Sequence, residues 1–215
     1  MNLGEIKIET LKLMFLNMNQ DIIIEKLKTY SLDETYKSYL INMAGAINRC
    51  LSNIEEKRVL PSKTKQLNIA NGTASGSFLR FDLGTLIGDF YDIERIVRET
   101  DDGDYNGNFE YQREGNTIVL EKCEDSDGIT YTVIYKPCLK RVTSITPDDT
   151  ELNIPDNIAS NIPYFLKGEL YRDDEPNEAS EARNWYEAAM EEIMMKADKQ
   201  INNINQTKNV YLQTE

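Results

Sequence analysis

The stretch SLDETYKSYLINMAGAINRCLSNIEEKRVLP, residues 31–61, decides how this chain is divided. Ser31 and Glu34 have the spacing of a capping box, in which two side chains satisfy the first free N–H groups of a helix. Pro61 disfavours helical geometry in the residue before it, so the helix is expected to end near Leu60. Between these limits apolar residues recur at helical spacing, which predicts one apolar face along a long helix: Tyr36, Tyr39, Leu40, Met43, Ile47, Cys50, Leu51 and Ile54.

Two shorter helices are predicted before this stretch, at 5–16 and 21–29, and strands are predicted after it. Beyond Pro61 the chain has short runs of β-branched and aromatic residues, which are typical of strands. The sequence Glu114-Gly115-Asn116 predicts a tight hairpin turn, and 125–128 predicts a second. Several short antiparallel strands predict a small sheet or a sandwich; the runs lie at 65–70, 78–83, 92–99, 109–113, 117–123 and 129–136.

Helical periodicity returns near Pro155 or Asp156 and continues through Tyr171. A longer apolar stripe then runs from Pro176 to Ile201, and it includes Trp185 and Tyr186, which are expected in the core.

Neither set of helices has an evident partner except the other. We therefore predict an α+β fold: a helical bundle made of the N-terminal helices (1–61) and the C-terminal helices (147–201). An antiparallel β-sheet or small β-sandwich (62–146) is inserted between them. Residues 202–215 are polar and aperiodic, so they are predicted to form an extended tail that is disordered in the isolated chain.

The charge balance excludes several classes of function. The 215 residues include 24 Lys and Arg, 37 Asp and Glu and no His, for a net charge of −13. A Ser–His–Asp triad or an HExxH zinc site cannot be built without histidine. A nucleic-acid binder with a strongly basic surface is also disfavoured. Residues 147–198 hold 14 acidic and 4 basic residues, so this segment alone carries −10.

Candidate ligand sites in the sequence favour ordinary structural roles. The segment 102–107, DGDYNG, matches the first half of a calcium loop, but Arg113 stands where the bidentate Glu belongs, so a solvated turn is expected. The segment 72–76 has two glycines but lacks the Lys-Ser/Thr of a phosphate loop, so a loop that connects strands is expected. The acids at 173–175 are expected to complement the N-terminus of the next helix. We predict no catalytic residue, metal or cofactor, and no enzyme activity.

The cysteines predict a reducing compartment, and the hydrophobic runs predict a protein that does not span a membrane. Three cysteines without a CxxC pair predict free thiols, with Cys50 in the core and a Cys123–Cys138 bridge disfavoured. No signal peptide or membrane-spanning run is expected. The basic stretch 57–65 is interpreted as a solvated helix end rather than a phosphate contact.

One feature of the predicted tail suggests a partner. Val210, Tyr211 and Leu212 form an apolar triplet in a polar segment where nothing local buries them. Such a segment commonly becomes ordered on a partner. The alternative is that the tail packs on its own bundle.

Several segments together resemble the neck, or head–tail connector, proteins of tailed bacteriophages: adaptor, gateway or head-completion proteins. The likeness begins with DFYDIERIV (89–97) and continues with the strand GITYTVIY (128–135) and the linker ITPDDTELNIP (145–155). It ends with IPYFLKGELYRDDE (162–175), followed by 179–192 with its Asn-Trp-Tyr centre. In that family a pattern of this type is a helical pair that closes the bundle.

The resemblance implies a non-enzymatic virion protein at the head–tail junction, made in the host bacterial cytoplasm. Such proteins form a ring, commonly a dodecamer, beneath the portal protein. The ring extends the DNA channel and offers a platform to the tail or to a downstream neck protein. Genomic DNA passes through the lumen without specific binding. The family's C-terminal segment reaches into the portal or a neighbouring copy, which implies that role for 202–215, above all for Val210, Tyr211 and Leu212.

Two questions remain open at the level of sequence. An acidic lumen would repel DNA and let it slide, but acidity also serves solubility. The second hypothesis for function is a baseplate or minor tail component, or a protein-binding module that uses the β insert.

Overall fold

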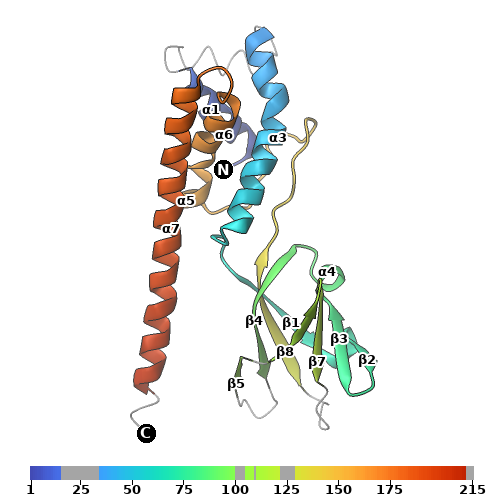
Figure 1. Ribbon diagram of the computed structural model, residues 1–215. Helices are drawn as coiled ribbons and strands as arrows, with labels where there is room; N and C mark the ends of the chain where they lie inside the picture. The colour runs from blue at the N-terminus through green and yellow to red at the C-terminus, as the bar shows by residue number, and fades with distance from the viewer. Residues whose placement is uncertain (16–33, 100–104, 109, 122–128, 212–215) are drawn as a thin grey trace. The chain divides into compact units, whose positions relative to one another are not determined.

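The computed structural model describes residues 1–15, 34–99, 105–108, 110–121 and 129–211. The chain forms two compact units, one helical (Met1–Val59 with Lys140–Glu215) and one built of strands (Leu60–Leu139; Figure 1). The fold is therefore α+β, as predicted.

Helices from both ends of the chain share the helical unit. The short helix α6 packs against α1, α3 and α7. Gly168 in α6 lets two helices approach closely, because a Cβ placed there would lie 3.1 Å from the Ala179 carbonyl oxygen in α7. The helices of this unit are α1 (Leu3–Met14), α3 (Glu34–Glu56), α5 (Asp156–Ala159), α6 (Ile162–Leu170) and α7 (Pro176–Tyr211).

The ends of the first helices have identifiable causes. Asn2 and Glu5 form a capping box with bonds of 2.9 and 2.8 Å, so α1 begins earlier than its predicted start. Ser31 and the helix predicted at 21–29 lie outside the described residues. Helix α3 ends at Glu56, before the predicted Leu60, because Arg58 adopts a left-handed conformation (φ 55°) that stops the helix.

The C-terminal helices differ from the pattern in two ways. The single helix predicted from Pro155 to Tyr171 is wrong, because the chain breaks into α5 and α6. Pro163 sits in the first turn of α6, where its missing N–H does no harm, whereas further inside a helix it would remove a backbone bond. Helix α7 continues to Tyr211, although the pattern places its end at Ile201. The segment 202–211 contains no Gly or Pro to stop it.

Of the two predicted β architectures, the structure has the sandwich. One sheet has the order β1-β8-β4-β5 and the other β2-β3-β7-β6, and all pairs are antiparallel. Both sheets contribute to one core, in which the rings of Phe81 and Tyr131 lie 5.9 Å apart. The strands are β1 (Lys63–Asn68), β2 (Thr73–Ser75), β3 (Phe78–Asp82), β4 (Phe90–Glu99), β5 (Tyr105–Asn108), β6 (Gln112–Glu114), β7 (Thr117–Glu121) and β8 (Thr130–Pro137), with short helical turns η1 (Ile69–Asn71) and α4 (Leu83–Leu86).

The structure confirms one predicted turn of the β unit and differs from two other predicted loops. The hairpin at Gly115 is confirmed: it joins β6 to β7, and its φ of +63° is one that glycine adopts easily. The solvated turn predicted over 102–107 is wrong from Tyr105 onward, where β5 pairs with β4. The loop predicted at 72–76 is partly wrong, since the segment contains strand β2, which the turn at Gly76 (φ +62°) folds back on β3. The hairpin predicted at 125–128 lies outside the described residues.

Candidate functional site

The helical unit carries a groove between α3 and α7, with α6 as its floor. It consists of two adjoining hollows of about 420 and 410 Å³, and both are lined by Arg49 and Glu169. Arg141 and Arg183 line the first hollow, and Arg172 lines the second. We call this feature the arginine groove.

The groove gathers most of the arginines of its unit. The helical unit contains five arginines, of which only Arg58 is not among the groove's lining residues. The same lining also holds four carboxylates, those of Glu56, Glu169, Asp173 and Asp174, so positive and negative side chains are equal in number in the groove. Guanidinium groups bind carboxylates and phosphates through paired N–H donors.

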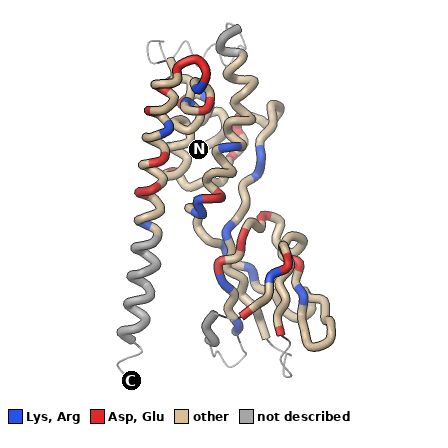
Figure 2. Tube along the Cα trace, viewed as in Figure 1, with Lys and Arg blue, Asp and Glu red and all other residues tan. Residues whose placement is uncertain are grey.

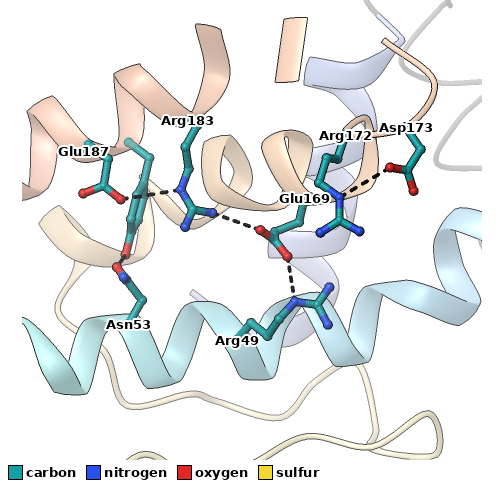
Figure 3. A network of polar contacts seen from close by, with 8 residues as sticks. Arg49, Asn53, Glu169, Arg172, Asp173, Arg183 and Glu187 are labelled. Atoms are coloured by element: carbon teal, nitrogen blue, oxygen red, sulfur yellow. Dashed lines mark hydrogen bonds and ion pairs between the residues drawn. The ribbon is translucent and has the colours of Figure 1, made fainter. Parts of the chain in front are cut away.

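Glu169 holds the two walls of the groove together (Figure 3). Arg49 Nε on α3 donates to one carboxylate oxygen at 2.6 Å, and Arg183 Nη1 on α7 donates to the other at 3.1 Å. Arg183 is further fixed by Phe165, whose ring centroid lies 4.0 Å below the guanidinium carbon, and by Glu187 at 3.5 Å. A short α6 side chain thus joins two long helices.

Arg49 is an exposed cation of the groove, although Arg172 is more exposed, at 71%. Its side chain is 60% exposed. Within the described part of the chain it is paired with Glu169 through Nε alone, which leaves its two Nη groups to bind an incoming acceptor. Gly45, one turn earlier on α3, adds no side chain in front of it; a Cβ there would lie 3.6 Å from Arg49 Nη1.

Another arginine of the groove, Arg141, lies where the chain returns from the β insert to the helical unit. Its guanidinium donates to both oxygens of Glu55, at 3.1 and 2.6 Å, and the Glu55 side chain is only 3% exposed. The Asn48 side chain bonds both the N–H (2.9 Å) and the carbonyl (2.8 Å) of Val142. These contacts fix the re-entering chain against α3.

The hydroxyls around the groove are neutral donors. Burial raises the pKa of Tyr186, whose hydroxyl donates to Asn53 Oδ1 at 2.9 Å. Burial, together with its bond to Asp174 (2.7 Å), raises the pKa of Tyr39. Burial also raises the pKa of the Cys50 thiol to about 12. With raised pKa values these three groups stay protonated at neutral pH. They therefore serve packing and hydrogen bonding rather than nucleophilic attack.

The acidic segment 173–175 directly precedes Pro176, the first residue of α7, and two of its carboxylates also have side-chain partners. Asp174 accepts a hydrogen bond from Tyr39, and Asp173 pairs with Arg172 at 3.4 Å. The acidic residue in the first turn of α7 is Glu178. The segment therefore ties the α6–α7 turn to α3.

The predicted docking triplet lies at the end of α7. Val210 and Tyr211 are its last two residues, and Leu212 lies outside the described residues. The core positions predicted for Cys50 and Tyr186 are confirmed, but that for Trp185 is wrong, because its side chain is 63% exposed. It precedes the buried Tyr186 by one residue, which rotates it about 100° off the buried face.

The remaining sequence candidates have ordinary surroundings. Lys57 and Lys63, from the basic stretch, pair with Glu187 and Asp89. Cys138 is a free thiol, while Cys123 is outside the described residues. Within the described ranges no cluster of three or more metal-ligating side chains exists. Nor does any helix in those ranges have the length and apolarity to cross a membrane.

Sequence reasoning missed the arginine groove. Its arginines come from α3, from the re-entry segment, from the α6–α7 turn and from α7, so no local motif joins them. No protein-family model matches the chain, and no curated protein sequence is similar to it.

Proposed function

We propose that this protein is a structural component of a tailed-phage virion, located at the neck between portal and tail. In this proposal its helical unit is a bundle, several copies form a ring around the DNA channel, and the ring provides a platform for the tail. The proposal involves no catalysis.

The observation that carries the proposal is the stretch of α7 that follows Met190, its last buried residue among the described side chains. The buried positions of this helix end at Met190, and among the described side chains of 191–197 none is buried. The helix nevertheless continues to Tyr211. Helical stability in water comes mostly from packing an apolar face, so the lack of buried side chains at 191–197 fits a segment that docks on another protein. Met194 and Met195 are exposed on it, 38% and 61%.

The distribution of charge supports the same role. Asp and Glu gather on the α6–α7 turn and on the first half of α7 (Figure 2). Acidic groups repel the phosphate backbone, so a ring that presents them to its lumen lets DNA pass without binding it. The resemblance of 89–97, 128–135, 145–155 and 162–192 to phage connector proteins points the same way.

The experiment that tests this function is purification of virions from the phage whose genome encodes the chain, followed by mass photometry of the protein with and without its portal. We expect the chain in purified particles and a portal complex heavier than the portal alone. A chain that never co-purifies with particles and never binds the portal contradicts the proposal.

A second candidate function follows from the β unit. It is a separate compact unit with its own core, and it exposes Phe78 and Tyr91, 46% and 36%. Large exposed aromatics are typical of protein-binding surfaces. In this alternative the protein is a baseplate or minor tail component, or a module that holds a protein ligand on its β unit.

A further inference from the structure

The two ends of the β unit lie next to each other. Its first strand, β1, pairs along its whole length with its last strand, β8, so that Lys63 stands opposite Tyr135. Lys136 Nζ also donates to the Leu60 carbonyl oxygen at 2.9 Å. The chain therefore enters and leaves this unit at neighbouring points, which is the arrangement that lets one domain be inserted into another.

The helical unit is closed on its own side of the insertion. Helix α3 ends at Glu56, and the returning chain is fastened to its last turns, where Arg141 donates to Glu55. The Val142 N–H donates to the Asn48 side chain at 2.9 Å. Helix α6, which follows the insert, packs against α1 and α3, which precede it. The segments before and after the insert thus pack directly on each other.

Each unit also has a hydrophobic core of its own. Among the described residues, the thirteen that form the core of the β unit all lie between Leu67 and Tyr135. In the helical unit the rings of Phe165 and Tyr186 lie 5.0 Å apart, and Leu166 of α6 is fully buried. The β unit spans 60–139, which is longer than many domains of about 55–65 residues that fold alone.

We propose that the β unit is an autonomous insert, which opens and refolds as one cooperative unit while the helical unit stays folded. Regions with their own buried contacts open as separate cooperative units. Because the ends of the folded insert are neighbours, the insert leaves the end of α3 and the returning chain close together, so neither unit needs the other to complete its core. The helical unit therefore opens without unfolding the insert as well.

This autonomy has a consequence for assembly that rests on the proposed function. The exposed stretch 191–197 of α7 belongs to the helical unit, so opening of the β unit leaves that docking segment folded. The two units can then engage different partners without disturbing each other. The autonomy itself rests on the two cores and on the paired ends of the insert.

Native-state hydrogen exchange of the full-length chain, followed by peptide mass spectrometry in low urea, tests the inference. Leu120→Ala removes a fully buried side chain from β7, and its matched counterpart Leu166→Ala removes one from α6. We expect Leu120→Ala to speed exchange in β4, β7 and β8 by at least about thirtyfold and to change exchange in α3 and α6 by less than about twofold. Leu166→Ala should give the reverse pattern.

A milder pair keeps the test readable if a unit unfolds outright. Ile118→Val in the β unit and Ile6→Val in α1 each trim one fully buried side chain, and each should speed exchange about two- to tenfold in its own unit alone. An unfolded β unit beside a protected helical unit in Leu120→Ala supports the inference equally.

The inference is overturned if Leu120→Ala or Ile118→Val speeds exchange in α3 and α6 by the same factor as in the strands, because the chain then opens as a single unit. Failure of the autonomy is distinguishable from failure of the function. Particles that hold the protein at the neck, with both units exchanging together, refute the autonomy alone. Separate exchange in a protein that is absent from particles refutes the function alone.

Discussion

The ion pair between Arg141 and Glu55 should stabilise the helical unit more than any exposed pair in it. The pair links α3 to the chain that returns from the β unit, across 86 residues of sequence. Arg141→Ala removes the guanidinium and leaves the Glu55 carboxylate, which is 3% exposed, without its bidentate partner. Losing one partner of a fully buried pair costs about 3–5 kcal/mol.

The expected cost here is smaller, because the Arg141 side chain is 44% exposed and water screens the pair. We therefore expect a loss of about 2–3 kcal/mol in the free energy of unfolding. For a unit of this size that corresponds to a decrease of about 5–10 °C in Tm. Urea unfolding followed by circular dichroism at 222 nm is the assay, since all the longer described helices belong to the helical unit.

The matched control is Arg172→Ala, which removes a pair whose partners are 71% and 85% exposed and should change stability by less than about 0.5 kcal/mol. A double-mutant cycle with Glu55→Gln should show coupling of about 1–3 kcal/mol. If Arg141→Ala unfolds within about 0.5 kcal/mol of the wild type, the reasoning about the buried carboxylate is wrong.

Three further predictions follow from buried or paired groups. Tyr186→Phe keeps the packing but removes the donor to Asn53, so unfolding free energy should fall by about 1–2 kcal/mol in urea titrations; an unchanged midpoint contradicts this. Cys50, with a pKa of about 12, should resist iodoacetamide at pH 8 in the folded protein and react on unfolding, as peptide mass spectrometry can show; rapid labelling under native conditions counts against its burial. Asp89 is partly buried, which raises its pKa, but bonds from Lys63 and Tyr135 outweigh this and hold the pKa of the carboxyl below its usual value of 3.8. The ionised carboxylate therefore adds to the free energy of unfolding above about pH 4, and this contribution is lost as the pH falls below that value. In Asp89→Asn the free energy of unfolding should depend less on acid pH than in the wild type. Equal pH profiles of the two proteins contradict the assignment.

The architecture could be predicted from the sequence because its periodicities are strong. The change from helical spacing to short β runs after Pro61 indicates the insert, and the hairpin at Gly115 follows from local turn chemistry. The element ends were harder to predict. The break before Pro163 and the stop at Arg58 depend on single residues that periodicity averages out.

The candidate site could not be predicted because it is tertiary. Arg49 and Arg183 approach each other only when α3 and α7 pack over α6, and Glu169 joins them there. Trp185 was misplaced for a related reason. It is adjacent to the buried Tyr186 in sequence. The apolar stripe predicted for this helix is one residue wider than the buried face, so it includes both residues.

Immunogold labelling of intact virions tests the central claim most directly. An antibody against the β unit, applied to particles of the phage whose genome encodes the chain, should place gold at the junction between head and tail. Particles that lack the gene product should show no label there. Label at the distal end of the tail, or no label on particles at all, would contradict a role at the neck.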